Sequence, residues 1–214
     1  MSKITVLLGT ALIFFSSLAS GQQENTAAAS RFENIKKLLD YRYKGGFFTF
    51  EKDFLEQVKY PDEARKNCVI GIVIASFYVD CDGNYNPMKT RLKNPLHFGI
   101  EQEISKFLNS TQGHWNICHD KKYTRFEIPI QFTMEGTVTN EDDAAIVLEG
   151  KNPGYACTSD SVYLQRAIKY LKKNKMKKAA KNLGILIQRN PYNNEYYEML
   201  KKTINRKKAK KEKK

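Results

Sequence analysis

The residues best suited to chemistry in this chain are two histidines and a cysteine that lie close together. His114, Cys118 and His119 are near neighbours in the sequence, and imidazole nitrogen and thiolate sulfur are ligands that zinc prefers. Three groups fall short of the four ligands of a structural zinc site, and Cys118 is expected to form a disulfide. We therefore predict no metal site, and keep a small metal-binding protein or enzyme using His114 and His119 as an alternative.

Other catalytic signatures are missing from the sequence. It contains no Gly-x-Ser-x-Gly, no glycine loop of the kind that cradles phosphate, and no His-Glu-x-x-His. Asp142 and Asp143 lie in an expected linker, where a solvated run of charge is the ordinary explanation. The sequence therefore predicts a non-catalytic protein without a cofactor.

The first residues have the organisation of a signal peptide. Lys3 precedes an apolar run over 4–15, and small residues at 19–21 offer a cleavage site before Gln22. We predict an exported, periplasmic protein with a signal peptide over 1–21. An uncleaved inner-membrane anchor is the alternative, because the apolar run is only slightly short of a span. Export predicts that the four cysteines form disulfides.

Basic charge is concentrated in the C-terminal third. Residues 161–214 carry 18 Lys and Arg against 3 acids, whereas residues 1–160 carry 18 against 20. Such a region would suggest nucleic acid in a cytosolic protein, and export argues against that partner. Anionic lipid headgroups or envelope polymers are the expected partners of the basic tail, and a solubilising tail without a partner is the alternative.

Hydrophobic periodicity predicts an α+β domain after a flexible lead-in over 22–30. Helices are expected over 31–43, around 50–58 and over 98–108, and strands over 69–80, 86–92 and 123–134. A right-handed crossover between the last two strands gives an antiparallel sheet in the order 2-1-3. Pro129 supports an edge position for the third strand, because its missing N–H can face solvent there. A further short strand over 144–148 is left undecided.

The strand arrangement predicts how the cysteines pair. Cys68 and Cys81 bracket one extended strand, which places them about 40 Å apart at about 3.3 Å per residue. An antiparallel third strand starts near the end of the first, so Cys118 comes close to Cys81. We predict the disulfides Cys81–Cys118 and Cys68–Cys157.

From residue 160 the pattern becomes helical. Helices are expected over 162–173, with Asp160 as the cap, over 177–188 and over 195–204. The spacing of five residues resembles a degenerate tetratricopeptide repeat: Ala167, Tyr170, Ala179, Leu183 and Pro191. A generic helical hairpin is the alternative, and the Lys-rich tail after residue 205 is expected to be disordered.

A group of motifs in the α+β domain is similar to the C-terminal domain of TonB. The run Tyr60-Pro61-Asp62-Glu63-Ala64-Arg65 is followed by Gly71, Phe77, Val79, Asp80 and Gly83, then Trp115 and Ile128-Pro129-Ile130-x-Phe132. The resemblance covers about residues 46–134. It implies two helices on a three-stranded sheet, located in the periplasm, that docks on outer-membrane receptors by pairing the third strand with a receptor peptide.

The chain departs from that family at several points. Six prolines cannot build a long Pro-rich spacer, residues continue well beyond the domain, and Cys118 stands where the family commonly has a proline. These departures put force transmission by a membrane-anchored transducer in doubt and leave the binding surface.

The sequence thus predicts a non-catalytic binding module linked to outer-membrane transport. Its segments are a signal peptide (1–21), a lead-in (22–45), the TonB-like domain (46–136), an acidic linker (137–159), helices (160–205) and a tail (206–214). Partner contacts are expected along the third strand, at Tyr123, Phe126, Ile128, Ile130 and Phe132. Coverage of that edge by the linker, or by a second copy in a homodimer, is the alternative.

Overall fold

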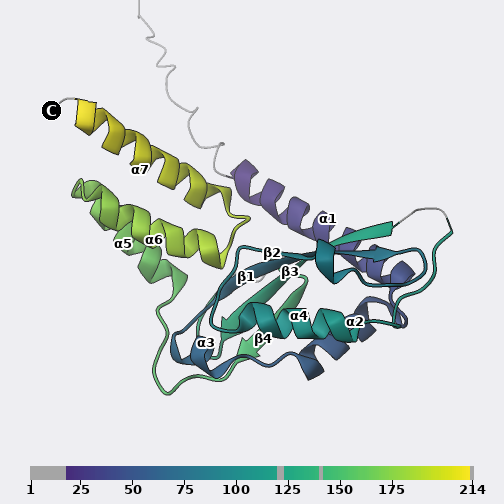
Figure 1. Ribbon diagram of the computed structural model, residues 1–214. Coiled ribbons are helices and arrows are strands. Elements are labelled where there is room, and N and C mark those ends of the chain that lie inside the picture. The colour runs from purple at the N-terminus through teal and green to yellow at the C-terminus, as the bar shows by residue number, and fades with distance from the viewer. Residues whose placement is uncertain (1–17, 120–122, 140–141, 213–214) are drawn as a thin grey trace, which may run out of the picture.

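The computed structural model describes residues 18–119, 123–139 and 142–212, and it has an α+β fold (Figure 1). Its elements in chain order are α1 (Leu18–Arg42), α2 (Gly46–Gln57), α3 (Asp62–Lys66), β1 (Gly71–Asp80), the 3-10 turn η1 (Pro87–Lys89), β2 (Arg91–Lys93), α4 (Ile100–Ser110), β3 (Tyr123–Met134), β4 (Ile146–Gly150), α5 (Asp160–Lys172), α6 (Met176–Arg189) and α7 (Asn194–Glu212).

The sheet is mixed and has the strand order β2-β1-β3-β4. β1 pairs antiparallel with both β2 and β3, and its register with β3 runs from Gly71↔Phe132 to Asp80↔Tyr123. β4 pairs parallel with the end of β3. The prediction of a three-stranded antiparallel sheet in the order 2-1-3 is therefore wrong, because the segment after β3 returns and adds a fourth, parallel strand.

One face of the sheet is covered by α2 and α4 (Figure 1). Apolar side chains from alternate positions of β1 and β3 meet Phe50 and Phe54 of α2 and Ile104 and Phe107 of α4. Edge-to-face contacts order the aromatic rings, as between Phe54 and Phe107 at 5.1 Å between centroids. Burial of these side chains supplies the main hydrophobic stabilisation of the domain.

The predicted lead-in belongs to a helix. α1 begins at Leu18, so residues 22–30 are helical rather than flexible. Three consecutive alanines favour helix, and Ala28 is buried together with Ile35 and Leu39 where α1 packs. Gly45 and Gly46, both with positive φ, end this segment because glycine adopts that conformation without strain. The predicted signal peptide falls mainly on residues 1–17, which lie outside the described part.

The second predicted strand is shorter than expected. Residues 86–92 contain the turn η1 followed by the three-residue β2. Pro87 starts η1, since its fixed φ suits the first position of a helical turn.

The C-terminal helices form a group beside the α+β part (Figure 1). α5, α6 and α7 enclose a small core around Ala167, Leu183 and Leu186. Ser159 occupies the cap position of α5 without a side-chain cap bond, and Asp160 instead accepts a hydrogen bond from Arg189 at 2.6 Å. The tail is helical through Glu212 rather than disordered, in keeping with the good helix propensity of lysine and the favourable position of cations at a helix C-terminus.

In the part of the chain that the structure describes, no helix has the length and apolar character needed to cross a membrane.

Candidate functional site

The side chains predicted to bind a partner lie mostly in the core. Tyr123 is half exposed at the start of β3, whereas the other four are buried, namely Phe126, Ile128, Ile130 and Phe132. Their alternation marks the inner face of β3, which faces α2 and α4. A partner pairing with this strand could therefore use its backbone, but not these four side chains.

β4 covers the outer side of β3 over its second half. Ile130–Met134 pair with Ile146–Gly150 in register. The expectation that β3 forms the edge of the sheet is therefore wrong for these residues, and coverage by the linker is what the structure has. The physical reason is hydrophobic: β4 brings Ile146 and Leu148 into the main core.

Pro129 marks the point at which this coverage begins. The amide of Ala145 donates a hydrogen bond to the carbonyl of Pro129 at 2.8 Å. The N–H and C=O of one strand residue point to the same side, so the nitrogen of Pro129 faces away from β1, toward the side on which β4 lies and not toward a free edge. The β3–β4 register starts at the next residue, Ile130.

Tyr60 and Gly150 hold β4 at its other end. The ring of Tyr60 packs edge-to-face on Phe132 with centroids 5.6 Å apart, and its hydroxyl donates a hydrogen bond to the carbonyl of Val69. A Cβ on Gly150 would lie 2.6 Å from Cδ2 of this ring, so glycine alone fits. Burial raises the pKa of the Tyr60 hydroxyl. The tyrosine of the Tyr-Pro motif thus contacts the added strand directly.

Among the residues that the structure describes, no strand pairs with the outer side of β4. The carbonyl of Gly150 accepts a hydrogen bond from the amide of Glu135, so the backbone of Gly150 faces β3. Gly150 pairs with Met134 in the parallel register, and Ala145 lies before β4. Because directions alternate along a strand, we infer that the N–H groups of Val147 and Glu149 within β4 face outward. Within the described ranges, β4 and β2 are the two outermost strands.

Both predicted disulfides are present. Cys68 bonds Cys157 and Cys81 bonds Cys118, which confirms the pairing derived from the strand directions. The first joins the start of β1 to the connection before α5, and the second joins the end of β1 to the segment before β3. They indicate an oxidising compartment outside the cytoplasm.

The alternative metal site does not assemble. Cys118 is in a disulfide, and the ring of His114 stacks on Tyr43 with centroids 6.0 Å apart. Over the described ranges, no three His, Cys, Asp or Glu side chains gather as a metal ion would require.

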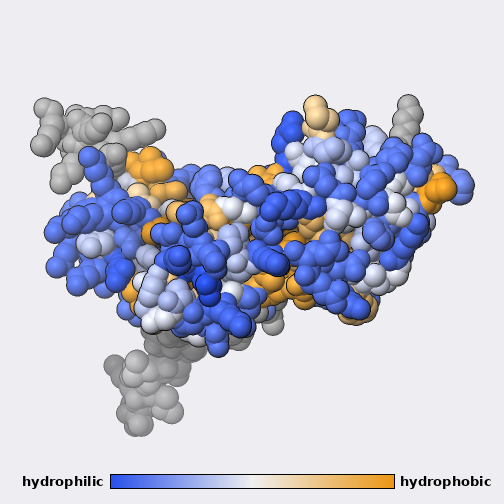
Figure 2. All heavy atoms as spheres, turned by 60° about the horizontal axis from the view of Figure 1, so that its bottom comes forward, coloured by the Kyte–Doolittle hydropathy of each residue, from blue (hydrophilic) through white to orange (hydrophobic). Residues whose placement is uncertain are grey.

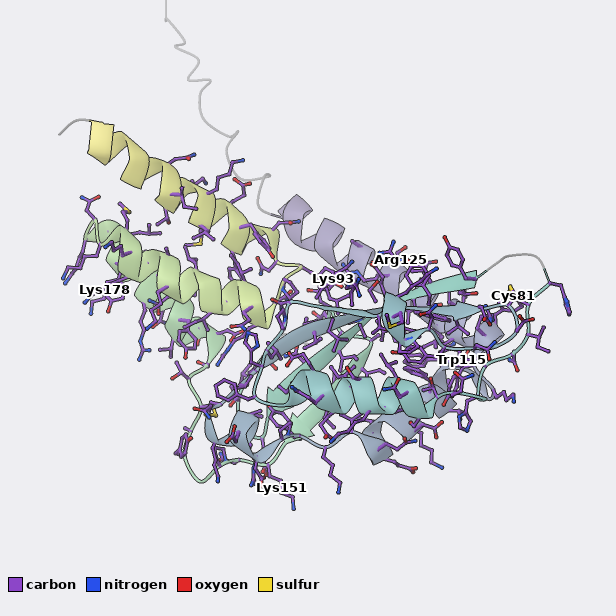
Figure 3. The ribbon with its side chains drawn as sticks, viewed as in Figure 1. Cys81, Lys93, Trp115, Arg125, Lys151 and Lys178 are labelled. Carbon is purple, nitrogen blue, oxygen red and sulfur yellow. A yellow bond between two sulfur atoms is a disulfide. The ribbon has the colours of Figure 1, made fainter. Side chains whose placement is uncertain are left out.

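Sequence reasoning missed a charged face of the sheet, on the side opposite α2 and α4. Lys93 and Arg125 lie close together on it (Figure 3), and both contact the carboxylate of Glu127. The alternation of polar residues at 91 and 93 and at 123, 125 and 127 was a visible signal. The register between three strands was needed to bring them together.

The predicted basic-tail site lies at the end of α7, where the side chains of residues 206–214 are outside the described part.

Hydrophilic side chains dominate the side of the molecule seen in Figure 2, and apolar groups there are small and scattered.

Comparisons with protein-family models, with curated proteins and with solved structures gave no match.

Proposed function

We propose that this chain is a non-catalytic binding module of the bacterial periplasm that captures an extended peptide of an envelope or outer-membrane protein by strand addition. The observation that carries the proposal is the outer side of β4, where the N–H groups of Val147 and Glu149 face away from the sheet. Strand addition uses such backbone groups for affinity.

The two outermost strands differ in their fitness for this role. β2 has three residues, and its two exposed side chains are Arg91 and Lys93; short length and charge are the usual devices that protect an edge. β4 has five residues with the sequence Ile-Val-Leu-Glu-Gly and contains neither lysine nor proline. β4 is therefore the outer strand better suited to pairing with an added peptide strand.

The resemblance to the TonB C-terminal domain supports the same type of binding and links the proposal to outer-membrane transport. In that family the partner peptide pairs with the third strand. Here β4 already occupies the outer side of β3, so the partner peptide is placed one strand further out. Displacement of β4 would expose Ile146 and Leu148, at a cost of about 1.5–3 kcal/mol each, which favours addition to β4.

A pair of substitutions at Glu149 tests the proposal. Glu149→Pro removes the outward N–H and leaves the bonds to β3, whereas Glu149→Ala keeps the N–H and removes the same exposed side chain. A photoreactive residue at Lys151, just beyond β4 (Figure 3), reports partners in intact envelopes, and one at Lys178 on α6 serves as the control position.

We expect one envelope protein to be cross-linked from position 151 in the unchanged protein and in Glu149→Ala, and to be lost in Glu149→Pro at equal stability. Equal cross-linking in both variants would refute addition to β4. A cross-link between two copies of this chain would instead identify a homodimer interface and would also overturn peptide capture.

The location rests on the N-terminal segment, and the intact mass of the protein from its own envelope tests it. A mass beginning near Gln22 supports a cleaved signal peptide. A mass that retains Met1 would favour a membrane-anchored transducer.

A further inference from the structure

A cationic face covers part of the sheet on the side opposite α2 and α4. We define it by four basic residues and two aromatic ones: Lys89, Arg91, Lys93, Arg125, Tyr78 and Tyr123. The register places them together, because Ser76 pairs with both Arg91 and Glu127, and Tyr78 pairs with Arg125. The core residues Phe77 and Val79 occupy the alternate positions and point the other way.

Cations and aromatic rings interleave on this face. The rings of Tyr78 and Tyr123 meet edge-to-face at 5.2 Å between centroids. The ammonium of Lys89 lies 5.9 Å from both centroids, and the guanidinium of Arg125 lies 5.9 Å from that of Tyr78. Two of the four cations thus lie within cation–π distance of the rings.

Acidic groups only partly balance these charges. Glu127 accepts from Lys93 at 2.6 Å and from Arg125. Asp80, at the end of β1, accepts from the amide of Asn84 at 2.8 Å. Lys89 and Arg91 form no ion pair among the described residues. The face therefore retains a net positive charge.

The face is exposed at one end and covered at the other. The carbonyl of Gln188 at the end of α6 accepts a hydrogen bond from Asn94 at 2.7 Å, next to the buried residues Ile72 and Gln131. Beyond them the side chains of Lys93 and Arg125 are 48% and 49% exposed. Tyr123 is 50% exposed, and Met88 in η1 is 83% exposed.

We propose that the cationic face docks on the surface of an anionic lipid bilayer. Four cations on one side of a sheet complement a layer of negative headgroups, and each basic residue near such a surface favours binding by about fivefold. Tyrosine suits the interface between headgroups and acyl chains. Met88 precedes Lys89 in η1 and is 83% exposed, so docking would bring an apolar side chain of this turn to the boundary of the acyl chains.

The test uses the full mature chain and sedimentation with vesicles of equal parts phosphatidylglycerol and phosphatidylcholine. Lys93→Gln combined with Arg125→Gln removes two charges from the cationic face. The matched control, Lys52→Gln combined with Lys106→Gln, removes two exposed charges from α2 and α4. All variants keep the basic tail, so its contribution is constant.

We expect the first pair to lower binding by about 30-fold, from about fivefold per residue, and the control pair to lower it much less. Pure phosphatidylcholine vesicles should bind weakly, and added salt should weaken binding to the anionic vesicles. Equal losses for the two pairs would overturn the proposal, because net charge alone would then explain binding.

A second readout locates the contact. Tryptophan emission from Met88→Trp should shift to the blue on addition of the anionic vesicles, whereas that from Glu56→Trp on α2 should not. Absence of a shift at position 88 would refute docking by this face. Tight binding of a soluble polyanion or an acidic peptide at position 88, without vesicle binding, would also refute it by showing that the partner is a polymer.

Discussion

Replacing Gly150 with alanine should weaken the packing of β4 against the rest of the sheet. An added Cβ would lie 2.6, 2.8 and 2.9 Å from three atoms of the Tyr60 ring, against about 3.5–4.0 Å for a relaxed contact. The ring cannot yield freely, because its hydroxyl is bonded to Val69 and its edge packs on Phe132. Either Tyr60 or β4 must move by about 1 Å.

The expected cost follows from overpacking. Extra methyl groups in a packed site cost about 1–3 kcal/mol, and the lower chain entropy of alanine in the unfolded state returns about 0.4–1 kcal/mol. We therefore expect Gly150→Ala to lower the free energy of unfolding by about 1–2 kcal/mol in urea denaturation. The melting temperature should fall by about 2–8 °C for a chain of this size. Amide exchange in β4 should accelerate more than in β1.

Gly184 provides the matched control. It lies within α6, and a Cβ there would meet nothing within 4 Å. Gly184→Ala should raise stability by about 0.5–1 kcal/mol, because glycine is unfavourable inside a helix. If Gly150→Ala were as stable as Gly184→Ala, with unchanged exchange in β4, the ring of Tyr60 would not confine this strand and our account of the site would fail.

Three further predictions concern other contacts. Replacing Cys68 and Cys157 with serine opens a loop of 89 residues and should lower the free energy of unfolding by about 4–5 kcal/mol in chemical denaturation. A loss under about 1 kcal/mol would contradict the view that this disulfide restricts the unfolded chain. Arg42→Met removes donors to the carbonyls of Asp80 at 2.6 Å and Asn116 at 3.1 Å and should cost about 3 kcal/mol, measured by thermal denaturation. Hydrogen bonding from Lys93 lowers the pKa of Glu127, so Glu127 stabilises the fold above its unfolded pKa of about 4.3 and loses this effect as pH falls through the folded pKa. With a side chain 44% exposed, the loss should stay under about 1 kcal/mol, and Glu127→Gln should remove it from urea titrations compared between about pH 6 and pH 3.

The strands with a clear period of two were predictable. Residues 123–134 alternate apolar and polar side chains, and β3 has these bounds. The cysteine pairing followed from the length of the strand between Cys68 and Cys81 and from the antiparallel direction of this strand. β4 could not be decided, because a five-residue apolar run fits a strand or a covered loop equally well. Its position depends on Gly150 meeting Tyr60, a contact across 90 residues that no local pattern reports.

The charged segments show the same limit. A run of lysines predicts disorder by composition, yet lysine also favours helix. Tyr196 and Met199 pack on the small core that includes residues of α6, and this packing stabilises the first turns of α7, from which the helix can continue. The cationic face could not be assembled from the alternating polar residues of single strands. Its members come from η1 and three strands, and only the pairing of Ser76 with Arg91 and Glu127 places them on one side.

The charges on β2 have a second explanation besides membrane docking. Substitutions elsewhere on the cationic face can distinguish the two explanations. Arg91 and Lys93 would protect a short outer strand from pairing with other chains. That explanation does not extend to Lys89, which lies over two tyrosine rings, or to Arg125 in β3, which pairs with β1 and has Arg42 of α1 bonded to the neighbouring Thr124. Lys89→Gln combined with Arg125→Gln leaves β2 unchanged. If protection of the edge were the whole role of these cations, this pair would bind anionic vesicles as the unchanged protein does; if the face docks on a bilayer, binding should fall by about 30-fold, from about fivefold per residue, with no gain in aggregation.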